Sequence, residues 1–189
     1  MKRIINILIL FFLSLSGFGQ NNFRSTGTIE MGGEIGLSSL SSSKSGETQV
    51  TISSNLFFGF MISPGLELGL RPGFTLRNES GHSYKIYNLF FNPAYNFNTS
   101  SNVYPYLGAI LGINSIGYDN ENYSGLGLGA EVGIKINLNG NSMFLIKFEY
   151  LSQNYTVSNI GFGQSGDEKI NNVSIGAGFR IFLEKNQKH

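Results

Sequence analysis

The sequence predicts an all-β protein, an eight-stranded antiparallel up-and-down transmembrane β-barrel. Three observations lead to this fold class. Apolar and polar residues alternate through most of the chain after residue 20, as they do in strands with one apolar face. Charged residues form only 13% of the chain although the mean hydropathy is −0.01, which is unlike a soluble domain and unlike a helical membrane protein. Shorter and longer connections also alternate between the expected strands.

Length and composition set the outer limits of the interpretation. The 189 residues leave room for one domain. The chain contains no cysteine, which excludes a disulfide framework, a thiolate metal site and the cysteine of a lipoprotein anchor. The formal net charge of +1 indicates no nucleic-acid partner.

The first 19 residues have the three parts of a secretory signal peptide. Lys2 and Arg3 form the basic start, residues 4–15 form the apolar core, and Gly17 and Gly19 supply small residues at the cleavage point. An uncleaved anchor is the alternative, but this apolar run is short for a helix that must cross about 30 Å of hydrocarbon. We therefore expect a cleaved signal peptide, residues 1–19, and a barrel domain, residues 20–189, outside the cytoplasm.

Eight segments carry apolar residues at alternate positions, and no later segment approaches the roughly 18 consecutive apolar residues of a transmembrane helix. The expected strands are residues 28–38, 50–62, 66–77, 84–97, 103–113, 126–138, 144–150 and 173–183.

In the first four segments the alternating apolar residues are Ile29, Met31, Ile35 and Leu37; Val50, Ile52, Leu56, Phe58, Phe60 and Ile62; Leu66, Leu68, Leu70, Phe74 and Leu76; and Tyr87, Leu89, Phe91, Tyr95 and Phe97. The fourth segment is the least regular, with asparagines at 88, 92 and 96 on its other face. In the last four segments they are Val103, Leu107, Ala109, Leu111 and Ile113; Leu126, Leu128, Ala130, Val132, Ile134, Ile136 and Leu138; Phe144, Ile146, Phe148 and Tyr150; and Val173, Ile175, Ala177, Phe179, Ile181 and Leu183. The sixth segment is the clearest, because glycine or a polar residue occupies every intervening position.

The connections between these segments differ in length. Short turns are expected near residues 63–65, 98–102 and 139–141, and Asn139-Gly140 is a typical hairpin turn. Longer loops are expected near residues 39–48, 78–83, 118–124 and 157–168, the first of them rich in serine. Long external loops and short periplasmic turns are typical of outer-membrane barrels with both termini in the periplasm. Most of the expected strands have roughly ten to fourteen residues, which is long enough to cross a bilayer at a tilt.

The apolar face is expected to meet lipid. In a soluble lipocalin-like barrel the apolar face points inward, and the exterior is normally rich in Lys and Glu. Here the polar face consists mainly of Gly, Ser and Asn with few charges, as suits a crowded lumen. The one strand charge on the apolar face is Lys85, near a loop, where its ammonium can reach the lipid headgroups.

The charges on the polar face are nearly balanced, and in a narrow lumen they must pair because an unpaired buried charge is costly. The expected lumen network comprises Glu30, Glu34, Glu67, Arg71, Arg77, Glu131, Lys135, Lys147, Glu149 and Arg180. Its expected role is structural, since side chains can fill the interior of an eight-stranded barrel. A conducting or ligand-binding lumen remains the alternative.

Three stretches resemble the family of small outer-membrane β-barrel proteins of the OmpX and OmpA-domain type. They are residues 104–109 (YPYLGA), the glycine-alternating segment 126–138, and residues 173–180 (VSIGAGFR). Family members usually end on an aromatic residue, whereas here Phe182 and Leu183 are followed by residues 184–189. The resemblance spans the whole mature chain. It implies a location in the bacterial outer membrane, contact with outer-membrane lipid, and assembly by periplasmic chaperones and the barrel-insertion machinery. It also implies a structural, adhesive or protective role without enzymatic activity.

Few residues offer catalytic chemistry. The two histidines are His82, expected in a loop, and the final residue His189. His82 and Ser83 are adjacent and so point to opposite faces of a strand, and no carboxylate is placed to orient the imidazole. Residues 161–166 (GFGQSG) match the dinucleotide fingerprint without the strand and helix that it requires. Asp167 and Glu168 are weak indications of a cation site.

We therefore expect a monomeric, non-catalytic outer-membrane barrel without cofactor or metal, acting in envelope structure or through its external loops. The alternative is a pore for small solutes or a barrel that transports a hydrophobic ligand. A lipid hydrolase or acyltransferase is the least supported class.

Overall fold

The computed structural model describes residues 24–42, 48–79, 82–99, 101–118, 121–139, 141–158 and 165–183. These residues form eight strands: β1 (Ile29–Ser42), β2 (Thr48–Ser63), β3 (Leu66–Glu79), β4 (His82–Asn96), β5 (Val103–Tyr118), β6 (Glu121–Asn139), β7 (Ser142–Ser158) and β8 (Ser165–Leu183). Each strand pairs antiparallel with its neighbours in sequence, and β8 pairs with β1 to close the barrel. The predicted fold class is confirmed. Within the described residues no helix is long and apolar enough to cross a membrane.

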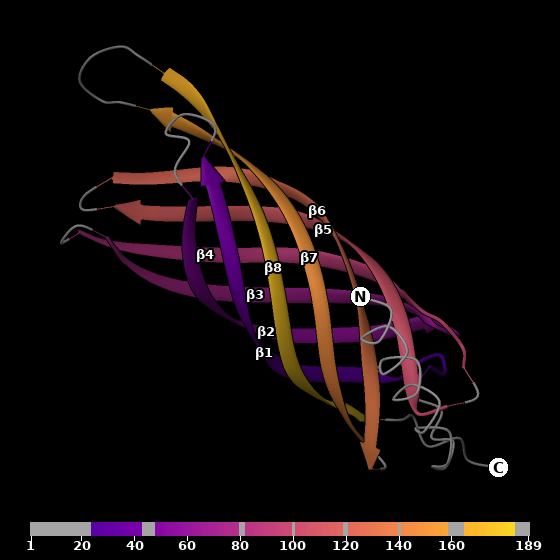
Figure 1. The fold of residues 1–189 in the computed structure, drawn as a ribbon. Coiled ribbons are helices and arrows are strands. Elements are labelled where there is room, and N and C mark those ends of the chain that lie inside the picture. Colours follow the sequence, from indigo (N-terminus) through magenta and orange to yellow (C-terminus); the bar gives the residue numbers. More distant parts are fainter. Residues whose placement is uncertain are drawn as a thin grey trace, which may run out of the picture.

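The strands wind obliquely around the barrel, as Figure 1 shows. Paired residues lead from Met31 through β2 to β8 and return to β1 at Ser41, a displacement of ten residues for one circuit. A stagger of this kind requires strands that tilt at roughly 35–45° to the barrel axis. A row of paired residues followed from β1 to β8 therefore rises along the barrel axis, toward the end where β1 joins β2.

The two ends of the barrel differ. We call the end where β1 joins β2, β3 joins β4, β5 joins β6 and β7 joins β8 the loop end, and the opposite end the turn end. At the turn end Pro64 and Gly65 connect β2 to β3, and Gly65 has a φ of 83°, which favours glycine. Residues 24–28 also lie there: the Gly65 amide donates to the Arg24 carbonyl (3.1 Å), and the Gly27 amide donates to the Met61 carbonyl (2.8 Å). The expected signal peptide, residues 1–19, lies outside the described residues.

The strands extend farther toward the loop end than predicted, from 14 residues in β1 to 19 in β6 and β8. The loops expected at 78–83 and 118–124 are largely strand, because β3 ends at Glu79, β4 begins at His82, and β6 begins at Glu121. Strand also replaces part of the serine-rich loop, since β1 continues to Ser42, and part of the loop at 157–168, since β8 begins at Ser165. Alternation stops where both faces of the sheet meet water, whereas the backbone ladder continues to form hydrogen bonds there.

Three prolines lie within the strands, Pro72 in β3, Pro93 in β4 and Pro105 in β5, and a hydrogen bond compensates for the backbone donor that Pro93 lacks. Pro93 has no N–H, and the register between β4 and β5 passes from Phe91 directly to Ala94. The side-chain amide of Asn92 donates to the Ala109 carbonyl at 2.7 Å and so satisfies an acceptor beside the interruption. The wall therefore stays hydrogen-bonded at this point.

Candidate functional site: the barrel lumen

The alternating apolar residues lie on the outside of the barrel. On β6, Leu126 is 70% exposed while Glu131, on the other face, is 5% exposed. The apolar face of β8 runs from Val173 to Leu183, a distance of about 33 Å along a strand and about 25 Å along the axis of a barrel with this tilt. This height matches the apolar band of outer-membrane barrels. One predicted outward residue differs: Val103 is 3% exposed, because it begins β5 beside a turn in which Thr99 donates to its carbonyl.

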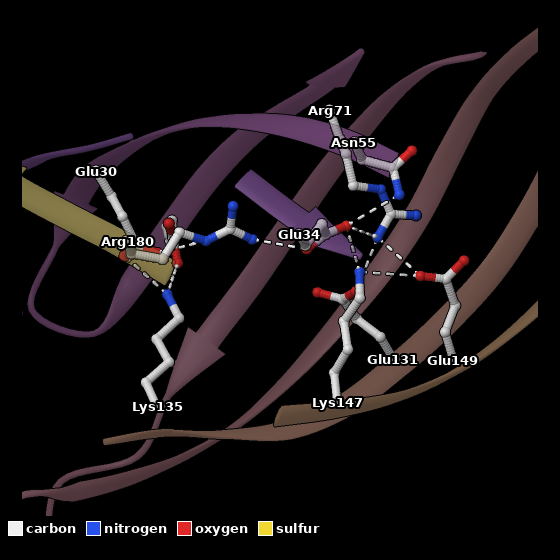
Figure 2. Close-up of polar contacts among 10 residues, drawn as sticks. Glu30, Glu34, Asn55, Arg71, Glu131, Lys135, Lys147, Glu149 and Arg180 are labelled. Atoms are coloured by element: carbon white, nitrogen blue, oxygen red, sulfur yellow. Dashed lines mark hydrogen bonds and ion pairs between the residues drawn. The ribbon is translucent and has the colours of Figure 1, made fainter. Parts of the chain in front are cut away.

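Charged side chains gather in two groups along the lumen. The lower group, nearer the turn end, contains Glu30, Glu67, Lys135 and Arg180 (Figure 2 labels all but Glu67). The Lys135 ammonium lies 2.8 Å from Glu30 Oε2 and 2.6 Å from Glu67 Oε2, and Arg180 Nε lies 3.3 Å from Glu30 Oε1. The Asn96 amide also donates to Glu67 Oε2 at 3.2 Å. These four charged residues come from β1, β3, β6 and β8, and the pairs of Lys135 connect β6 with the distant strands β1 and β3.

The upper group contains Glu34, Arg71, Glu131, Lys147 and Glu149. Arg71 Nη1 lies 2.8 Å from Glu149 Oε2, 3.0 Å from Glu131 Oε2 and 3.5 Å from Glu34 Oε1. The Lys147 ammonium contacts the same three carboxylates at 2.7 to 3.1 Å. Arg180 Nη2 donates to Glu34 Oε2 at 2.9 Å and joins the two groups, as Figure 2 shows.

The structure therefore brings together nine of the ten predicted lumen charges. Arg77 lies on β3, paired with Tyr84, but its side chain is outside the described residues. The register explains the assembly: inward positions on strands far apart in sequence face one another across a narrow barrel.

Apolar and aromatic side chains also fill the lumen, and the sequence pattern did not reveal them. Nearest the turn end is a cluster of Met61, Tyr104, Met143 and Phe182. Two further clusters lie between and beyond the charges; they consist of Ala94, Tyr106 and Leu145, and of Phe90, Ile110 and Leu151. The sequence does contain a sign of them, because some positions on the polar face of a strand hold an apolar residue. Phe90, next to the outward residue Phe91, and Ile110, between two outward residues, are examples.

Aromatic rings cover several of the buried cations. The Arg180 guanidinium lies 3.8 Å from the centre of the Phe57 ring, and the Arg71 guanidinium lies 5.3 Å from that of Phe90. A Cβ atom at Gly59 would overlap the Glu67 carboxylate and the Phe57 ring. The glycine therefore makes room for long side chains of its neighbours, as the sequence predicts for this face.

A cavity of about 80 Å³ lies on the loop-end side of the upper charges. Its lining includes Thr51, Asn88 and Asn172, each with a buried oxygen that lacks a protein hydrogen-bond partner. A water needs roughly 10–15 Å³ of such space, so the cavity has room for several waters. It is a polar recess above a filled lumen.

The described part of the chain offers little for catalysis. His82 is the first residue of β4 and pairs with Glu79, which corrects the loop position expected for it; its side chain is not described. The described residues hold no group of three or more His, Cys, Asp or Glu arranged to hold a metal ion. Of the stretch that matches the dinucleotide fingerprint, residues 161–164 lie outside the described residues, and Ser165 and Gly166 are the first two residues of β8. Asp167 and Glu168 follow them in the same strand.

The closed antiparallel barrel, its apolar exterior and its filled polar lumen define the class of small transmembrane β-barrels of the outer-membrane type. The structure is similar to that of Neisserial surface protein A, with a TM-score of 0.68, 20% identity, and coverage of 82% of this chain and 98% of that one. It is also similar to OprG from Pseudomonas aeruginosa (TM-score 0.55, 14% identity, covering 86% and 98%) and to AlkL in lipid bilayers (0.56, 10%, covering 92% and 98%). These likenesses show a shared fold. No family model matches the sequence, and no curated protein matches it.

Proposed function

We propose that the chain is a monomeric, non-catalytic and non-conducting barrel of the bacterial outer membrane. It serves envelope structure or surface interaction through the strands and loops of its loop end, which faces outward. The observation that carries this proposal is the filled lumen, in which nine charged residues pair above a plug of Met61, Tyr104, Met143 and Phe182. The continuous apolar exterior supports a location in lipid.

The role of the nine charges in this proposal is structural. Each of the four cations in this network contacts at least two carboxylates. Several of the contacts cross the lumen between strands that are not neighbours in the wall, as between Lys135 and Glu30 and between Arg71 and Glu149. Such contacts resist changes in the cross-section of the barrel. They also remove the water-filled path that conduction requires.

Two measurements test the proposal. Protein refolded in detergent micelles is expected to migrate differently on a gel before and after boiling, and to remain insoluble without detergent. In a planar bilayer it is expected to produce no stepwise conductance. The double variant Arg71→Ala/Phe90→Ala, which shortens two lumen side chains, is the comparison that should begin to conduct. Conductance steps from the unmodified protein would overturn the non-conducting role.

The recess near Thr51, Asn88 and Asn172 favours a second candidate, uptake or retention of a small hydrophilic solute. Its volume of about 80 Å³ is small for a hydrophobic transport ligand. Swelling of proteoliposomes in glycerol separates the two candidates. A rate equal to that of empty vesicles is expected of a filled barrel, and faster swelling would support the solute pathway instead.

A further inference from the structure

A groove of about 820 Å³ lies on the exterior of the barrel across β4 to β7, near the loop-end edge of the apolar band. Its outward lining is divided by polarity. Leu89, Ile113 and Leu126 are 49%, 56% and 70% exposed and form its apolar part. Ser115, Ser124 and Asn154 form its polar part.

The register places the polar part nearer the loop end. Leu89, Ile113, Leu126 and Asn154 share one row of paired residues, and Tyr87, Ser115 and Ser124 share the next row toward the loop end. Rows rise toward the loop end from β4 to β7, because one circuit of the barrel displaces the register by ten residues. Asn154 therefore lies beyond Leu89. Toward the loop end, Ser115 lies beyond Ile113 on β5 and Ser124 lies beyond Leu126 on β6. The groove crosses the boundary between the apolar band and the polar surface.

A cation, Lys85, lies outside the lining of this groove, one outward row farther toward the loop end than Tyr87 and Ser115. Lys85 is exposed and lies two residues beyond Tyr87 on the same face of β4, about 7 Å farther along the strand. Its register partner is Gly117, which has no side chain, so the lysine has room to lean over β5 toward Ser115. Its long stem can cover apolar surface while the ammonium stays at the level of lipid headgroups.

We infer that this groove binds a phosphorylated glycolipid of the outer leaflet. Acyl chains pack on Leu89, Ile113 and Leu126, sugar hydroxyls meet Ser115, Ser124 and Asn154, and a headgroup phosphate pairs with Lys85. Such a lipid has acyl chains, sugars and phosphate in sequence. The surface has apolar residues, polar residues and a lysine in the same sequence toward the loop end. The inference rests on the proposed membrane location and extends it to a particular lipid class.

The test measures lipid retention by native mass spectrometry on the full barrel, refolded in dodecyl maltoside. The probes are lipid A with its phosphates, the same lipid after dephosphorylation, and phosphatidylglycerol. Phosphorylated lipid A is expected to be retained best. Lys85→Gln should lower its retention about tenfold, the loss of one charge-assisted hydrogen bond. The control is Arg24→Gln, which removes a cation at the turn end, on the other side of the apolar band from the groove, and should leave retention nearly unchanged.

Equal losses in the Lys85 and Arg24 variants, or equal retention of the three probes, would overturn the inference. Heat-dependent gel mobility reports the fold of every variant in the same samples. A barrel that folds in detergent but shows no preference among lipids refutes the groove alone. A chain that is soluble without detergent refutes the membrane location itself.

Discussion

Glu34 contacts three cations through its two carboxylate oxygens. Oε1 lies 2.7 Å from the Lys147 ammonium and 3.5 Å from Arg71 Nη1, and Oε2 lies 2.9 Å from Arg180 Nη2. It is the residue that joins the upper and lower charge groups. A single glutamate on β1 thereby connects β3, β7 and β8 across the lumen.

Replacing this carboxylate should be costly. Glu34→Gln keeps the shape of the side chain but leaves three buried cations short of negative charge, and breaking a buried pair costs about 3–5 kcal/mol. We expect a loss of this size in the free energy of unfolding, measured by urea titration in detergent micelles. The control Ile35→Val changes the adjacent outward residue and should cost less than about 1 kcal/mol. Equal effects of the two substitutions would contradict the role assigned to Glu34.

The direction of each side chain could largely be predicted from the sequence, while its contacts could not. Alternation correctly placed Leu126 outside and Glu131 inside. Alternation does not show, however, which residues of two strands pair with each other. The contact of Lys135 with Glu30, 105 residues away, depends on that pairing. Phe90 and Ile110 were not predicted as lumen residues. Each has an apolar residue on both sides, so the sequence there does not alternate and does not show which face the side chain is on.

At the scale of the element, β6 shows how depth in the membrane controls what a strand tolerates. Its outward apolar residues run from Leu126 near the loop end to Leu138 near the turn end, with Val132 in the middle. The inward residues between them include Glu131 and Lys135, which belong to the network. The same strand thus carries lipid contacts and ion pairs on opposite faces.

This arrangement predicts that one substitution has different costs along β6. Val132→Arg places a cation near the middle of the apolar band and should destabilise the barrel by about 2–4 kcal/mol, whereas Leu126→Arg lies near the boundary and should cost about 0–1 kcal/mol. Unfolding titrations of the barrel in lipid vesicles give both values. Equal costs at the two positions would mean that the apolar exterior does not face a bilayer.

For whole elements, sequence and structure agree on the number and order of strands but differ on where they end. The tight turn at Pro64–Gly65 was predictable, because its residues favour turns. The extension of β3 and β4 to Glu79 and His82 was not, because hydrogen bonding between backbones leaves no mark on side-chain alternation.

At the scale of the whole molecule, the proposed signal peptide implies that export precedes folding. Residues 1–19 are expected to be removed, so the protein recovered from the outer membrane of an expressing bacterium should begin at Gln20. Intact-mass measurement checks this point. Retention of the first 19 residues in the membrane-inserted protein would contradict the proposed signal peptide.

The pairing of β1 with β8 has a kinetic consequence. Ile29 pairs with Leu183, so closing the barrel joins residues 154 positions apart. Contacts this far apart in sequence form slowly, since their loop-closure entropy must be met before they contribute stability. Until that seam closes, β1 and β8 are open edges with unpaired backbone groups, which are prone to aggregation. We expect the chain to depend on chaperones between export and closure, and shortening this interval should raise the yield of folded barrel more than strengthening any one strand pair.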